Sequence, residues 1–176
     1  MSPQNNNDDE TFSRRASAGM IIVGWIIFFL LLTLLFSKLI DNMNNPNAAV
    51  ETSTVNGRKQ IVLQRNEYGH YVATGAINGQ PVVFLVDTGA TDVAIPEATA
   101  QRLGLKKGRA FPTQTANGTG MAFSTQLDSV SLGEITLMDI RGSILANAGT
   151  EEILLGMAFL KHLELNQKGD ELRLMQ

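Results

Sequence analysis

The sequence predicts an all-β domain with one or two short helices, preceded by a single N-terminal transmembrane helix. Residues 18–36 form an apolar run without a charged side chain. From Val55 onward, apolar and polar residues alternate with a period of two, which is typical of strands that bury one face. The pairs Asn78-Gly79 and Asn117-Gly118 separate alternating segments, and Asn-Gly is a strong signal for a tight β-hairpin.

The composition limits the chemistry that the chain can perform. Its 176 residues, 44% of them hydrophobic, suit one globular domain plus additional segments. The net charge of −3 gives no reason to expect nucleic acid as a partner. Cysteine is absent, which excludes disulfides, thiol catalysis and cysteine-based zinc sites. With only two histidines and no Gly-x-Ser-x-Gly motif, a Ser-His-Asp triad has few candidates.

The N-terminal region predicts a membrane anchor. Residues 1–17 are polar and predict a disordered cytoplasmic tail. The anchor, residues 18–37, is close to the roughly 20 residues that cross a bilayer as a helix. A cleaved signal peptide is the alternative, but its apolar region is usually shorter and ends at a small-residue cleavage site. Arg14 and Arg15 precede the run and only Lys38 follows closely, so the N-terminus is expected in the cytoplasm.

The rest of the chain divides into a linker, residues 38–54, and a β domain, residues 55–176. Asparagine, Pro46 and small residues mark the linker as a flexible spacer. Short helices are expected over residues 96–103, where proline begins and glycine ends the segment, and over residues 157–162. The predicted strands are residues 60–64, 70–77, 81–86, 92–95, 110–115, 120–127, two within 130–145, 153–155, and a terminal pair at 163–165 and 171–174.

The segment Phe84-Leu85-Val86-Asp87-Thr88-Gly89-Ala90 is the main functional signal. It places a carboxylate at the end of an apolar strand, on a turn that contains glycine. Burying a carboxylate is costly unless it is paired or hydrogen-bonded, so such a position indicates a function. The Asn78-Gly79 hairpin would provide a rigid support for this loop.

This segment resembles the active-site loop of the aspartic proteases, in which apolar residues lead into Asp-Thr-Gly-Ala. The later segment Leu154-Leu155-Gly156-Met157 resembles the apolar-apolar-Gly element that packs under that loop in the family. Together they resemble the retropepsin-like branch, and its bacterial membrane-anchored group in particular. The resemblance implies a closed retropepsin-like β-barrel, a protein or peptide substrate, and no metal or other cofactor.

The resemblance also implies a homodimer, because the chain has one Asp-Thr-Gly loop and the chemistry needs two facing carboxylates. Asp87 would be the catalytic residue of each copy. Thr88, Gly89 and Ala90 would support the loop, and Leu154, Leu155 and Gly156 would pack beneath it. Expected at the tip of a flap over the substrate are Thr115, Ala116, Asn117 and Gly118.

Several alternatives remain open at this level. The flap could be an ordinary surface hairpin, and the terminal hairpin could be a dimer contact or an edge within one chain. Asp92 could be a second acid, although such residues more often bond to nearby backbone or face solvent. A catalytically silent binding or dimerisation module with this fold, and an unrelated β domain, compete with the enzyme. The expected location is the bacterial inner membrane, with the domain in the periplasm.

Overall fold

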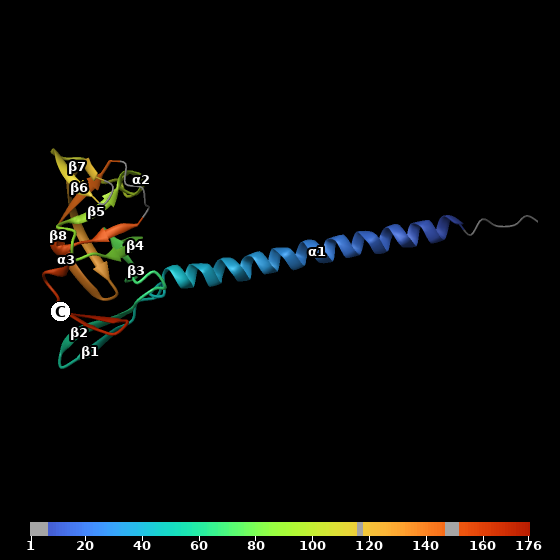
Figure 1. Cartoon of the computed structure of the whole chain (residues 1–176), viewed down its shortest axis with the longest axis horizontal. Helices are drawn as coiled ribbons and strands as arrows, with labels where there is room; N and C mark the ends of the chain where they lie inside the picture. Colours follow the sequence, from blue (N-terminus) through green and yellow to red (C-terminus); the bar gives the residue numbers. More distant parts are fainter. Residues whose placement is uncertain (1–6, 116–117, 147–151) are drawn as a thin grey trace, which may run out of the picture. The chain divides into compact units, whose positions relative to one another are not determined.

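A computed structural model describes residues 7–115, 118–146 and 152–176 of the chain. The chain divides into two compact units after Asp41. Figure 1 shows a long helix in the first unit and strands in most of the second.

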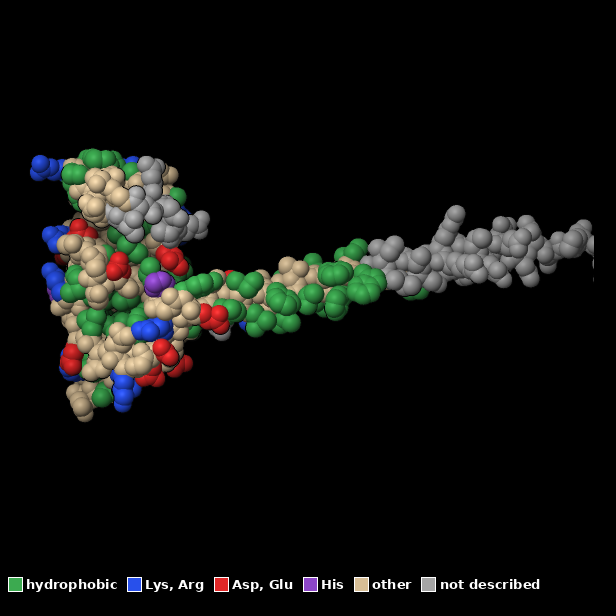
Figure 2. Space-filling view, in the orientation of Figure 1, with side chains coloured by type: hydrophobic (Ala, Val, Ile, Leu, Met, Phe, Trp, Pro, Cys, Tyr) green, Lys and Arg blue, Asp and Glu red, His purple; other side chains and the backbone are tan. Residues whose placement is uncertain are grey.

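The first unit is formed by helix α1 (Asn7–Asn44), which runs on into the first residues of the second unit. Among the described residues, Val23–Asp41 is long and apolar enough to cross a membrane. Apolar side chains follow this part of α1 (Figure 2). The helix begins at Asn7, within the segment predicted as a disordered tail. A helix lengthens at low cost once an apolar segment has nucleated it, and the polar composition of the tail did not reveal this.

The largest sheet of the second unit closes into a barrel, as predicted. Its strands are β3 (Val72–Ile77), β4 (Gln80–Val86), β5 (Val93–Pro96), β6 (Ala110–Thr115), β7 (Gly118–Leu132), β8 (Ile135–Leu145) and β9 (Ile153–Leu155). The strand order is β3-β4-β9-β5-β8-β7-β6. An additional pairing of β3 with β7, through Ala76–Ser131 and Ile77–Val130, joins the sheet to itself. Of the described strands of this sheet, only β6 lies outside the closed ring.

A second sheet has the order β1-β2-β11-β10. It contains β1 (Thr52–Val55), β2 (Arg58–Gln64), β10 (Glu164–Lys168) and β11 (Glu171–Met175). The predicted terminal hairpin is therefore present, and its second strand lies between β10 and β2 of the same chain. Among the described strands, only the outer edges of β1 and β10 are left unpaired in this sheet.

The core and the short helices agree with the predicted pattern. Helices α2 (Glu97–Arg102) and α3 (Met157–Leu160) correspond to the two expected helical segments. The largest fully buried side chains are Phe84, Phe159, Ile61, Leu63, Ile77, Ile95, Leu127, Leu132, Ile135, Ile144, Ile153 and Leu155. They come from both sheets and from α3, so one apolar core holds the second unit together.

The first Asn-Gly pair forms the predicted turn between β3 and β4. Asn78 has a φ of 50° and Gly79 a φ of 76°, the left-handed values that a two-residue hairpin turn needs. The Asn78 side chain adds a further contact, because its Oδ1 accepts a hydrogen bond from the Ser129 N–H at 3.0 Å. This turn fixes the register that carries β4 to Asp87.

The predicted linker, residues 38–54, is not a free spacer. Helix α1 continues to Asn44, β1 begins at Thr52, and the Asn47 side chain between them is buried, with 5% exposed. The Asn47 Nδ2 donates hydrogen bonds to the Gln64 carbonyl at 2.9 Å and the Val72 carbonyl at 2.7 Å. Its Oδ1 accepts one from the Gln64 N–H at 2.7 Å. The amide thus joins β2 to β3, a role that composition alone does not reveal.

Candidate active site

Asp87 directly follows β4, the strand that places it. Strand β4 lies between β3, with which it is antiparallel, and β9, with which it is parallel. The Asp87 N–H continues the pairing with β9, because it donates to the Leu155 carbonyl at 3.2 Å. Phe84, three residues earlier, is fully buried. The backbone of Asp87 is therefore part of the barrel wall, while its side chain is half-buried at the end of the strand.

The Asp-Thr-Gly loop forms a tight turn that begins at Asp87. The Ala90 N–H donates to the Asp87 carbonyl at 3.2 Å, which closes the turn. The Gly89 N–H donates to Asp87 Oδ1 at 2.8 Å. A hydrogen bond from a backbone N–H to a carboxylate fixes the orientation of that carboxylate. Thr88 and Gly89 are exposed, so this side of the loop is open in the single chain.

The residues that follow β9 support the loop from beneath. The Met157 N–H donates to the Ala90 carbonyl and the Ala158 N–H to the Thr91 carbonyl, both at 2.8 Å. Gly156 lies so close that a Cβ there would be 2.6 Å from the Ala90 carbonyl oxygen and 2.2 Å from that of Asp92. Only glycine permits this close approach, so the contact explains why the apolar strand is followed by glycine at position 156.

Asp92, the other carboxylate of this region, has a partner that the sequence did not suggest. Its Oδ1 lies 3.4 Å from Arg141 Nη2 on β8. The two groups form an ion pair without hydrogen-bond geometry, and Oδ1 is buried. No local motif links residues 92 and 141; only the parallel pairing of β5 with β8 brings them together.

The second Asn-Gly pair lies in the predicted β6–β7 hairpin. Strands β6 and β7 pair from Ala110–Phe123 to Thr115–Gly118, and Gly118 has a φ of 103°. Ala116 and Asn117, predicted at the tip, and the side chain of Thr115 lie outside the part of the chain that the structure describes. The assignment of this hairpin as a flap stays a prediction.

The remaining candidates for chemistry are few. Both imidazoles, His70 and His162, are exposed, in the turn before β3 and just after α3. Within the described residues, no group of three or more acidic or histidine side chains could hold a metal ion. Asp87 is therefore the main candidate for a catalytic residue among the described residues of the barrel unit.

Comparison with known proteins agrees with this geometry. The family model of the gag-polyprotein putative aspartyl proteases matches residues 73–162, about half of the chain, from β3 through α3. A crystal structure of a retropepsin-like aspartic protease from Rickettsia conorii has 28% sequence identity and a TM-score of 0.56. That alignment covers 72% of this chain and 93% of the Rickettsia chain.

Two curated bacterial relatives are similar in sequence. An uncharacterized protein in the cobV 5′ region of Sinorhizobium sp is 35% identical over 133 residues, which cover 73% of this chain and 57% of the relative. An uncharacterized protein of Rickettsia prowazekii (strain Madrid E) is 33% identical over 109 residues, 60% of this chain and 46% of the relative. The chain thus spans about half the length of these relatives. By its family match and its barrel, the chain belongs to the gag-polyprotein putative aspartyl protease family and is a retropepsin-like aspartic protease in fold.

Proposed function

We propose that the chain is a membrane-anchored aspartic endopeptidase in which two copies of Asp87, one from each subunit of a homodimer, activate water. The observation that carries this proposal is the Asp87 loop. A backbone network holds the loop from two sides, while its carboxylate has only the Gly89 N–H as a described partner. A side chain held in this way is oriented for chemistry and is not used for packing.

The need for a second subunit follows from the chemistry. Peptide hydrolysis by carboxylates requires one group that takes a proton from water and one that gives a proton to the scissile carbonyl. Two carboxyl groups close together share a proton, which supplies both roles at once. One Asp-Thr-Gly loop is present in the sequence, so a two-fold axis through a dimer is the simplest source of the second acid. Asp92 is occupied by Arg141 and is a poor substitute.

The other loop residues have roles in this proposal through the matching Asp-Thr-Gly motif. Thr88 would hydrogen-bond across the two-fold axis, which fits its exposure in the single chain. Gly89 would bring backbone N–H groups to the carboxylates, as it already does within one chain. The β6–β7 hairpin would cover the substrate and pair with it as an added strand.

The dimer contact is constrained by the second sheet. Strand β11 is paired on both sides within its own chain, so it is not available to a partner. The free edges of that sheet are β1 and β10. A dimer that extends this sheet would therefore add the partner at one of these two edges.

The anchor would keep the protease at a membrane. The Val23–Asp41 segment supports a single pass, and Arg14 and Arg15 favour a cytoplasmic N-terminus. The barrel would then face the periplasm of a bacterium. Tethering two copies in one plane raises their local concentration and favours the dimer.

The experiment uses the full chain in lipid nanodiscs with a diverse peptide pool, and mass spectrometry identifies the cleaved bonds. The wild type should cleave, while Asp87→Asn should not, because the amide can neither accept the proton nor share it. Asp128→Asn, an exposed carboxylate on β7, is the matched control and should leave cleavage unchanged. Cleavage by Asp87→Asn would overturn the mechanism. Failure of a confirmed wild-type dimer to cleave would favour the silent binding module.

A further inference from the structure

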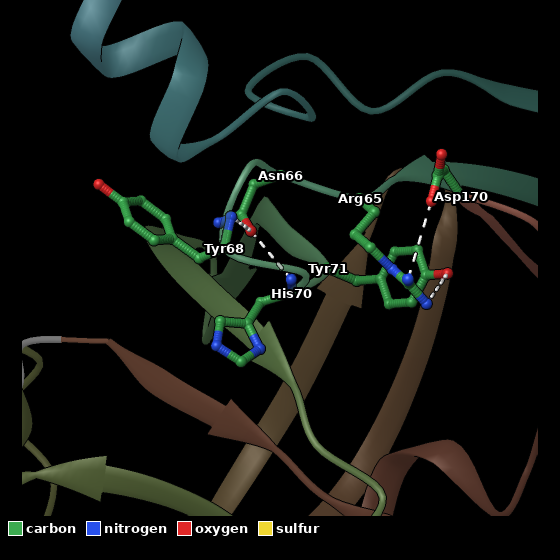
Figure 3. A network of polar contacts seen from close by, with 6 residues as sticks. All are labelled: Arg65, Asn66, Tyr68, His70, Tyr71 and Asp170. Atoms are coloured by element: carbon green, nitrogen blue, oxygen red, sulfur yellow. Dashed lines mark hydrogen bonds and ion pairs between the residues drawn. The ribbon is translucent and has the colours of Figure 1, made fainter.

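The turn between β2 and β3, residues 66–70, exposes the most accessible large apolar side chain of the described barrel unit. Tyr68 is 71% exposed. The second tyrosine of the chain, Tyr71, is only 8% exposed and takes part in packing. Its hydroxyl accepts a hydrogen bond from Arg65 Nη2 at 3.5 Å, and the Arg65 guanidinium lies 5.4 Å from its ring centre. Figure 3 shows the Tyr71 ring beside Arg65 and the Tyr68 ring directed away from it.

Asn66 holds this turn in one conformation. Its Oδ1 accepts hydrogen bonds from the Tyr68 N–H at 3.1 Å and the His70 N–H at 2.9 Å (Figure 3). The Asn66 N–H donates to the His70 carbonyl at 2.8 Å, and the Gly69 N–H donates to the Asn66 carbonyl at 3.0 Å. An exposed aromatic side chain on an ordered turn presents apolar area without a large entropy cost on binding.

The same asparagine fastens the turn to the end of α1. The Asn66 Nδ2 donates to the Asn44 carbonyl at 3.1 Å, the last residue of the helix. Next along the chain, Asn45 Nδ2 donates to Thr74 Oγ1 at 2.9 Å, and the Thr74 N–H donates to the Asn47 carbonyl at 3.1 Å. These bonds hold Asn44, Asn45 and Asn47 to the turn and to β3 within the second unit.

The number of residues between the candidate span and Asn44 limits the distance between the turn and a bilayer. The candidate span ends at Asp41, three residues before Asn44. At about 1.5 Å per helical residue, these three residues advance by only about 4–5 Å. The polar layer of a bilayer extends about 5–7 Å beyond the hydrocarbon on each side. In a chain anchored by Val23–Asp41, this short separation would bring the Asn44 carbonyl, and the turn bonded to it, to the layer of the lipid headgroups.

From these observations we infer that the 66–70 turn is a membrane-contacting surface, with Tyr68 inserted among the headgroups of the bilayer that α1 crosses. The inference rests on the membrane anchoring in the proposed function. Tyrosine suits this position because its ring is apolar and its hydroxyl remains hydrogen-bonded to water or lipid. The turn also contains the exposed Glu67, so attraction to anionic lipid is not the basis of the contact. A zwitterionic bilayer should be sufficient.

The experiment uses tryptophan fluorescence in phosphatidylcholine vesicles that contain a lipid with a nitroxide on its headgroup. Trp25 is the only tryptophan of the chain, so Trp25→Phe gives a full-length background without this fluorophore. Tyr68→Trp in that background reports on the turn. Met138→Trp, on β8 and 63% exposed in the native chain, is the matched control for an exposed barrel position.

Fluorescence at position 68 should be quenched strongly by the headgroup nitroxide, and fluorescence at position 138 should not. Equal quenching at the two positions, or none at position 68, would overturn the inference. The anchor is tested separately with the wild type, whose Trp25 should be quenched by a nitroxide on the lipid acyl chain. Loss of that signal would contradict the anchor itself, whereas its presence without quenching at position 68 would contradict only the membrane-contacting surface.

Discussion

The Asp87 loop and the Asn44–Asn47 segment show two opposite ways of holding irregular chain against the barrel. Backbone groups hold the loop, through Leu155, Met157 and Ala158, and the Asp87 side chain is left at its open side. At the entry to the barrel, the side chain of Asn47 makes the contacts and is buried. Because backbone groups hold the Asp87 loop, its carboxylate, with only the Gly89 N–H as a described partner, stays available for chemistry.

The largest effect on stability is expected where the loop is supported. Gly156→Ala places a Cβ against two backbone oxygens that cannot move without shifting the loop. Overpacking of this severity should lower the free energy of unfolding by about 3 kcal/mol or more. It should also abolish cleavage, because Asp87 would be displaced. Denaturant unfolding of the barrel and the nanodisc cleavage assay measure the two effects.

A glycine substitution without such contacts is the control. A Cβ at Gly120, on β7, would meet no atom within 4 Å. Gly120→Ala should therefore change the free energy of unfolding by no more than about 0.5 kcal/mol. A similar cost for both alanines would show that the close approach under the loop is not what makes Gly156 necessary.

Asn47→Ala should have the next largest effect. It removes three hydrogen bonds, two to the partly buried backbone of Gln64 and one to the buried Val72 carbonyl, at an expected cost of about 2–3 kcal/mol. Amide hydrogen exchange should accelerate at Gln64, whose N–H loses its acceptor. The exposed Asn166→Ala on β10 should change neither quantity. If Asn47→Ala and Asn166→Ala have the same free energy of unfolding, the segment that contains Asn47 is the free linker that the sequence predicts.

Asp92→Asn should have the smallest effect on the free energy of unfolding. It also tests whether cleavage depends on Asp87 and not on Asp92, the other carboxylate of the loop region. Its ion pair with Arg141 is partly exposed, 24% for the Asp92 side chain and 66% for Arg141. Pairs of this kind contribute about 1 kcal/mol or less. Cleavage should persist near the wild-type rate. Loss of cleavage without loss of stability would instead make Asp92 a second acid.

The sequence predicted the features that rest on local patterns. The Asn78-Gly79 turn, the strand that ends at Val86 and the apolar strand at residues 153–155 are where the patterns place them. The two strands expected within residues 130–145 correspond to the end of β7 and to β8, which are separated by the turn at Gly133.

The features that sequence did not reveal depend on long-range contacts. Asn47 appears in a run of asparagines typical of a linker, and only its fit between β2 and β3 distinguishes it. Arg141 meets Asp92 through strand pairing and not through any motif. The helical start at Asn7 depends on propagation from the apolar span, which polarity alone hides.

The central claim is that two copies of Asp87 form one active site. Wild-type and Asp87→Asn chains carrying different affinity tags can be co-expressed, and mixed dimers purified on both tags in sequence. We predict that the mixed dimer forms and does not cleave the peptides that the wild-type dimer cleaves. A mixed dimer that cleaves at about half the wild-type rate would show that each chain acts alone and would contradict the account.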